Sequence, residues 1–143
     1  MTIRYNPPGA WPQLGRAFNH GVVEPEGRRL HITGEVGWDA DGNIVGPGDC
    51  EAQMRQAFAN VEAILATAGG RLEDIVSMTI YFLNREDLPT IQRVRAEKLS
   101  SETAPASILV QVPGLVAPDL LVELVPIAVI PHERFKDPRE LGA

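Results

Sequence analysis

Glu123 is the residue of this sequence best placed to do chemistry. It stands alone among branched apolar side chains in residues 120–130, where an isolated carboxylate is costly unless it is paired or has a task. Leu121 and Val125 would share its face of an extended strand, because side chains alternate with a period of two. Glu123 is therefore a candidate base that activates water. The plainer alternative is a carboxylate paired with an arginine or lysine at a subunit boundary.

Other potentially reactive side chains are few. Ser107 has no base beside it in the sequence, so it suits a neutral cleft-lining role better than that of a nucleophile. His20 and His31 lie on two neighbouring predicted strands, but no third ligand has suitable spacing, so no metal is expected. His20 is a candidate proton carrier. Cys50 is the only cysteine, which excludes an internal disulfide. It begins a helix whose dipole can lower a thiol pKa, but a lone cysteine at such a position is more often incidental.

The N-terminal part is predicted to form strands and turns. Residues 1–17 are rich in proline, glycine and aromatic residues and indicate an irregular arm. Residues 21–23 and 29–33 flank Glu24-Pro25-Glu26-Gly27, which predicts a hairpin. Gly34 and Gly37 then indicate bends or a close approach of the backbone to another group.

Two helices are predicted from apolar residues at helical spacing. The first begins at Asp49, a suitable N-cap, and ends at Gly69-Gly70. Its opposite, polar face is expected to include Gln53. The second helix spans residues 88–99 and has a thinner stripe. The first stripe consists of Met54, Ala57, Phe58, Val61, Ile64, Leu65 and Ala68, and the second of Leu88, Ile91, Val94 and Leu99.

Three further strands complete the pattern. In residues 74–83, Val76, Met78, Ile80 and Phe82 would face the helices, whereas the semi-polar opposite face suits contact with another subunit. Residues 105–131 contain two apolar runs around a Pro/Gly turn, which predicts a C-terminal hairpin that carries Ser107 and Glu123. The order β-β-α-β-α-β-β favours an α+β two-layer sandwich, a mixed sheet with both helices on one face.

The length of the chain and its net charge limit the possible functions. The 143 residues suit a single domain, residues 1–143, with a charged tail at 132–143 that is expected to fray. A net charge of −6 argues against a nucleic-acid partner. No apolar run has the length of a membrane span, and no signal sequence is visible. A cytoplasmic protein is the simplest interpretation, and a second copy of the chain would cover the other sheet face.

Three stretches together carry a family resemblance: TGEVGWDADGNIVGPGD at 33–49, EAQMRQAFANVEAILATAGGRLEDIVSMTIYFLNREDLPTI at 51–91, and PASILVQVPGLVAPDLLVELVPIAVIP at 105–131. The chain resembles the RidA/YjgF superfamily, also called the L-PSP or reactive-intermediate deaminase family. The resemblance implies a chorismate-mutase-like fold and a homotrimer with a central barrel and ligand clefts between subunits. It also implies cofactor-free hydrolysis of reactive enamines and imines, such as 2-aminoacrylate.

The resemblance also implies roles for particular residues. Glu123 matches the glutamate thought to position or activate water. The remaining candidates would line the cleft and bind substrate: Thr33 and Gly34 at the turn, Glu35 where glutamine is usual, Phe18 where many members have tyrosine, Gln92 near an asparagine position, and His20 and Ser107.

Ser107 stands where the family has a carboxylate-binding arginine. A serine cannot neutralise a carboxylate, which shifts the expected substrate toward compounds without that group. Arg93 and Arg95 are most simply a solvated face of the second helix. The alternative is that Arg95 reaches the site from another direction and replaces the missing arginine.

Two other functions remain open at this point. The cleft of the trimer would bind a small metabolite without chemistry, as a module that signals or sequesters. The family's older label, endoribonuclease, is the weakest hypothesis, because the chain is acidic and shows no basic patch.

Overall fold

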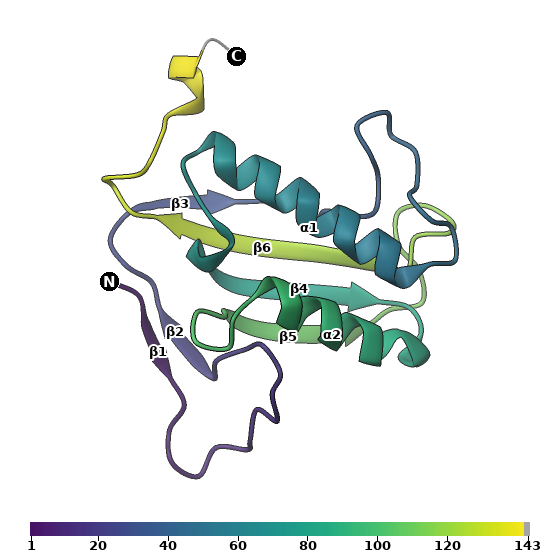
Figure 1. Cartoon of the computed structure of the whole chain (residues 1–143), viewed down its shortest axis with the longest axis horizontal. Coiled ribbons are helices and arrows are strands. Elements are labelled where there is room, and N and C mark those ends of the chain that lie inside the picture. The colour runs from purple at the N-terminus through teal and green to yellow at the C-terminus, as the bar shows by residue number, and fades with distance from the viewer. Residues whose placement is uncertain (142–143) are drawn as a thin grey trace.

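The computed structural model describes residues 1–141 and shows two helices lying on one side of a twisted sheet (Figure 1). The helices are α1 (Cys50–Thr67) and α2 (Leu88–Lys98). The strands are β1 (Ile3–Tyr5), β2 (Gly21–Val23), β3 (Arg28–His31), β4 (Ile75–Phe82), β5 (Ala106–Gln111) and β6 (Val122–Ile130). Short 3-10 helices lie at Leu72–Asp74, Arg85–Asp87 and Pro138–Leu141. The α+β two-layer, chorismate-mutase-like sandwich is therefore confirmed.

The main sheet has the strand order β3-β6-β4-β5. Strand β6 is antiparallel to both of its neighbours, and β5 is parallel to β4. The predicted C-terminal hairpin is thus wrong, because β4 lies between β5 and β6. Strand β4 hydrogen-bonds on both edges and takes the central place that its apolar residues favour. The order of runs in the sequence does not determine which strands pair.

The predicted N-terminal hairpin is also wrong. Strand β2 pairs with β1 in a separate two-stranded sheet, and β3 pairs with β6. The turn at residues 24–27 therefore joins two sheets. The consequence for function is that residues 6–20 form a loop whose ends are fixed by the small sheet.

One face of the main sheet packs under the helices and is called here the helix face. Met54, Phe58 and Leu65 of α1 are fully buried, as are Ile80 of β4 and Leu124 of β6. The register of β4 shifts at a bulge between Ile75 and Ser77. As a result Ile75 is buried and Val76, which was predicted to face the helices, is only half-buried. The rest of the predicted alternation in β4 holds. No helix within residues 1–141 covers the opposite face, which is called the open face.

Helix α1 begins as predicted. The Asp49 carboxylate accepts a hydrogen bond from the Ala52 amide at 3.1 Å, which satisfies one free amide of the first turn. The prediction for Gln53 is wrong, because this side chain is buried. Its amide donates to the Asp119 carbonyl and accepts from the Leu121 amide, so it holds the segment that leads into β6.

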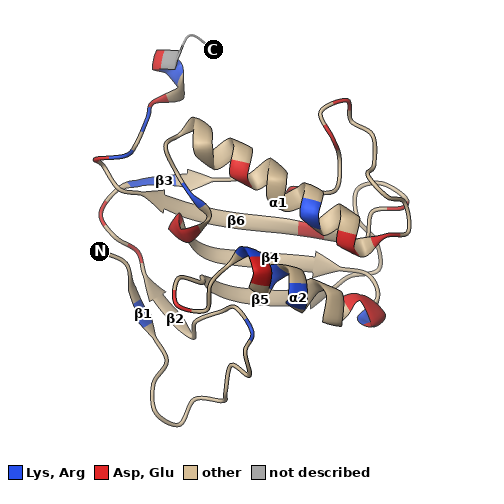
Figure 2. Ribbon diagram, viewed as in Figure 1, with Lys and Arg blue, Asp and Glu red and all other residues tan. Residues whose placement is uncertain are grey.

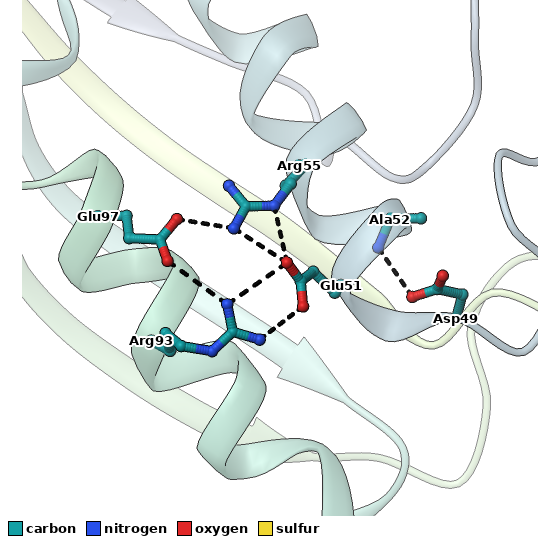
Figure 3. Close-up of polar contacts among 6 residues, drawn as sticks. All are labelled: Asp49, Glu51, Ala52, Arg55, Arg93 and Glu97. Atoms are coloured by element: carbon teal, nitrogen blue, oxygen red, sulfur yellow. Dashed lines mark hydrogen bonds and ion pairs between the residues drawn. The ribbon is translucent and has the colours of Figure 1, made fainter.

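The two helices are joined by a four-residue ion network between Glu51, Arg55, Arg93 and Glu97 (Figure 3). All four side chains are exposed or half-exposed, so the network contributes modestly to stability. Acidic and basic residues mix along both helices, whereas β4 and β5 carry neither (Figure 2). The network links the solvent-exposed sides of the two helices, whereas the fully buried Ile91 and Val94 mark the side of α2 that faces the sheet.

The tail, expected to fray, has contacts as far as Lys136. Arg134 forms a bidentate ion pair with the buried Asp74 at 2.6 and 2.9 Å, and the Lys136 amide donates to the Ala68 carbonyl. Gly69 ends α1 with a φ of +81°, and a Cβ there would lie 1.9 Å from the Arg134 carbonyl oxygen. This glycine is therefore required both by its conformation and by the tail that crosses it.

Candidate functional site

The turn at residues 33–35 lies against β6 beside Glu123. The Glu35 amide donates to the Leu124 carbonyl at 2.8 Å, and the Leu124 amide donates back to Glu35 at 2.9 Å. Gly34 therefore meets the Glu123 side chain closely: a Cβ on Gly34 would lie 2.8 Å from the carboxyl carbon. The close backbone approach predicted at this glycine is present, and it fixes where the carboxylate can sit.

Glu35 follows this glycine, and its backbone pairs with Leu124, the residue after Glu123. It is half-buried, and its pKa is raised above the ordinary value, first by burial and then by the charge of Glu123. A carboxyl group that keeps its proton to higher pH beside another carboxylate can act as an acid while its neighbour acts as a base. Thr33, Gly34, Glu35 and Glu123 together are called the carboxylate cluster.

A second group of polar side chains lies between α2 and β5. Arg95 donates from Nη1 to the Ser107 hydroxyl at 3.0 Å and from Nη2 to the Gln92 side-chain oxygen. Arg95 is only 1% exposed. Burial, followed by the charge of Arg16, lowers its pKa to about 10. Arg16, Gln92, Arg95 and Ser107 are called the arginine cluster.

Aromatic side chains of the N-terminal loop adjoin this cluster. Phe18, Trp11 and His20 pack on one another with ring centroids 4.5 to 5.4 Å apart. The Arg16 guanidinium lies 5.8 Å from the ring centroids of both Trp11 and Phe18. The loop is tied to the start of β5, because the buried Asn19 donates from its backbone to the Pro105 carbonyl and from its side chain to that of Ala104. Phe18 and His20 are therefore placed near Ser107.

The two clusters lie on opposite faces of the sheet within one chain. Ser107 pairs with Met78 and faces the helices, whereas Glu123 pairs with Tyr81 and lies on the open face. The residues predicted from the sequence thus fall into two sets. The carboxylate cluster brings Thr33, Gly34, Glu35 and Glu123 together, and the other set contains Phe18, His20, Gln92 and Ser107. A single chain does not bring these two sets together.

Comparison with known proteins identifies the family. The family model described as Endoribonuclease L-PSP matches residues 11–130. The chain belongs to this family. The RidA/YjgF resemblance found in the sequence is therefore confirmed, and 3-aminoacrylate deaminase RutC of Acinetobacter baylyi is 36% identical over 99 residues, which cover 69% of this chain and 77% of the relative.

Solved structures of the Rid family are similar to this chain. YyfB from Yersinia pestis, described as a protein of unknown function of the conserved Rid protein family, has a TM-score of 0.81 and 32% identity, and the match covers 90% of this chain and 98% of YyfB. RidA from the Antarctic bacterium Psychrobacter sp. has a TM-score of 0.66 and 30% identity, over 78% and 87% of the two chains. Across residues 1–141, every helix falls short of the length and apolar character that crossing a bilayer requires.

In this member of the Rid family, Arg95, like Gln53, does not lie on the solvated helix face that was the simpler expectation. It is buried toward the sheet, whereas Arg93 is exposed as expected and paired with Glu51. The helical spacing contained the signal: Arg95 follows Ile91 by four residues and precedes Leu99 by four, so it lies within the apolar stripe. Arg16 gave no comparable signal, because it lies in an irregular loop.

The remaining candidate reactive residues are Cys50 and His31. Burial and the neighbouring Asp87 raise the pKa of the Cys50 thiol to about 12, which is opposite to the expected effect of the helix dipole. His31 lies on β3 and pairs with Ile127. Within residues 1–141, no three histidine, cysteine, aspartate or glutamate residues gather in a way that could hold a metal ion.

Proposed function

We propose that this chain hydrolyses a small reactive imine or enamine to a carbonyl compound and ammonia, with Glu123 and Glu35 as the acid–base pair. The observation that carries the proposal is the Glu123 carboxylate held against Gly34, and the Glu35 carboxyl group, whose pKa is raised by burial and by the charge of Glu123, is the candidate acid. The relative named 3-aminoacrylate deaminase supports the reaction class. Imine hydrolysis needs water, a base and an acid, all of which this pair and solvent supply.

The proposed steps begin with the enamine, which gains a proton at carbon and loses one from nitrogen to solvent to become the imine. Glu123 accepts a proton from water while the water oxygen bonds to the imine carbon and the nitrogen takes a proton from the acid partner. The protonated Glu123 then gives its proton to the amino nitrogen of the carbinolamine, and the acid partner, now a carboxylate, accepts the hydroxyl proton as the C–N bond breaks. Ammonia leaves with the bonding electron pair, and the C=O bond forms. Both carboxyl groups return to their starting protonation states.

The complete site, in this proposal, forms between two copies of the chain in a homotrimer. The carboxylate cluster of one copy would meet the arginine cluster of its neighbour, because one chain holds them on opposite faces of its sheet. The open face supports this arrangement: Tyr81, Val125 and Ile127 are half-buried there without a covering helix. Sedimentation should give the mass of three chains, whereas a stable monomer would refute the shared site.

The test of the reaction is ammonia release from 3-aminoacrylate and from 2-aminoacrylate, each generated in the assay. We expect Glu123→Gln to lose turnover at unchanged fold. The matched control is Glu26→Gln, because Glu26 is exposed in the turn between β2 and β3 and forms none of the ion pairs among residues 1–141. Equal turnover in Glu123→Gln and wild type would refute the assignment of Glu123. Ligand binding by wild type without turnover of any enamine would favour the metabolite-binding alternative instead.

A further inference from the structure

The arginine cluster contains an unusual buried charge. Arg95 is 1% exposed, yet none of the ion pairs formed among residues 1–141 includes it. A guanidinium has five N–H donors. In Arg95, Nη1 donates one hydrogen bond to the Ser107 hydroxyl and Nη2 donates one to the Gln92 side-chain oxygen. Nε has no hydrogen-bond partner. Burying a cation without a carboxylate is strongly unfavourable, so its retention calls for a compensating anion.

A second cation increases this imbalance. Arg16 also forms none of those ion pairs, and its guanidinium is close enough to Arg95 for the two charges to repel. Its hydrogen bonds go only to the backbone carbonyls of Gln13 and Pro12. Two arginines whose charges repel, neither of them ion-paired among residues 1–141, attract a negatively charged ligand. Half-buried Arg16 is the member of the pair that solvent can reach.

We propose that Arg95 and Arg16, with the Ser107 hydroxyl, bind the carboxylate of the substrate. The positive charge would then come from α2 and from the N-terminal loop, and not from position 107 of β5, where the resemblance implies an arginine. The planar fork of a guanidinium matches a carboxylate, and the Ser107 and Gln92 contacts fix its orientation. This inference rests on the proposed function only for the identity of the anion. It reverses the expectation that Ser107 selects substrates without a carboxylate.

The ligand reaches Arg95 through the N-terminal loop. Arg16 rests against Trp11 and Phe18, and Trp11 is 60% exposed. The Arg16 side chain can therefore leave its aromatic contacts without disturbing the core, whereas Asn19 keeps the end of the loop fixed to the start of β5. In this proposal Arg16 moves from the two rings to admit the anion and then binds it together with Arg95.

The test is calorimetric titration of the intact protein with three unreactive probes: malonate, propionate and propionamide. Wild type should bind malonate more tightly than propionate, and propionamide not measurably, because two cations favour two negative charges. Arg16→Gln should weaken malonate binding about tenfold, the loss of one charge-assisted contact, and Arg95→Gln should abolish it. Arg93→Gln is the matched control, since it removes an exposed arginine two residues away on the same helix, and it should bind like wild type.

Several results would overturn the inference. Propionamide binding as tight as that of propionate would show that charge is not recognised. Tighter binding of phosphate than of malonate would overturn the carboxylate assignment. If Arg95→Gln fails to fold, unchanged affinity in Arg16→Gln alone is enough to refute the pair as the binding site.

Glu123→Gln separates this inference from the proposed function. The variant should bind malonate at least as tightly as wild type while it loses ammonia release, because it keeps both arginines and removes a negative charge. Malonate binding that depends on Arg16, without turnover of any enamine, would uphold the subsite and refute the enzyme. Turnover with malonate affinity unaffected by either arginine substitution would refute the subsite and leave the enzyme intact.

Discussion

Replacing Gly34 by alanine tests whether the position of the Glu123 carboxylate determines activity. The new Cβ would lie 2.8 Å from the carboxyl carbon and 3.0 and 3.2 Å from the two oxygens. Non-bonded carbon atoms prefer separations of about 3.5–4.0 Å, so the carboxylate would have to retreat by about 0.7–1.2 Å. Gly34 is not among the glycines with positive φ, and the alanine therefore adds no backbone strain.

A displacement of about 1 Å in a catalytic group lowers rate by roughly a hundredfold, or about 2.7 kcal/mol in the barrier. We expect kcat/KM for ammonia release to fall by about that factor in Gly34→Ala. Melting temperature should change little, because the atoms in the way belong to the far end of a flexible side chain. Thermal denaturation and the ammonia assay on the same preparation provide the two readouts.

Gly114→Ala is the control for this experiment, since nothing lies within 4 Å of a Cβ built at Gly114. It should retain wild-type kcat/KM and melting temperature. The reasoning would be refuted if Gly34→Ala kept wild-type kcat/KM, because the carboxylate would then act from a different position or not at all. Equal losses in the two variants would also refute it.

Three further predictions concern pH, stability and thiol reactivity. Burial and the charge of Glu123 raise the pKa of Glu35 above 4.5, so the contribution of Glu35 to folding stability is complete below pH 4.5 and is lost as pH rises through the folded-state pKa. The melting temperature of Glu35→Gln should therefore exceed that of wild type at pH 7 and should equal it near pH 4. Asp74→Ala leaves Arg134 without its buried partner and should cost about 3 kcal/mol in urea unfolding, and a cost below about 0.5 kcal/mol would contradict the role of this pair. Cys50, with a thiol pKa of about 12, should react with a disulfide reagent at pH 8 far more slowly in the native protein than in urea.

The sequence predicted well those features that local periodicity determines. Helix α1 begins at the Asp49 cap and ends at Gly69, and β4 alternates from Met78 to Phe82, because each pattern depends on neighbours a few residues away. The pairing of strands was predicted wrongly, since β5 and β6 are close in the chain but separated by β4 in the sheet. Apolar content indicates that a strand is buried but not which strand lies beside it.

The candidate site shows the same division. The glycine at position 34 indicated a close approach, and the structure places Glu123 there. The partner of Glu123 was not predicted as such, because Glu35 appeared in the sequence only as a departure from the usual glutamine. The burial of Arg95 was missed for a different reason: a charged residue within an apolar stripe was assigned to solvent by its type, although its spacing placed it toward the sheet.

The serine at position 107 and the arginine at position 95 are best understood together. An arginine at position 107 would point to the helix face of β5, where the Arg95 guanidinium already donates to the residue present. A second guanidinium there would add a positive charge beside Arg95, whose pKa burial and the charge of Arg16 already lower to about 10. Serine is small and accepts the hydrogen bond, so it removes this repulsion and orients Arg95. The serine at position 107 and the buried Arg95 are therefore a single physical arrangement, because the serine hydroxyl accepts the hydrogen bond that orients the guanidinium.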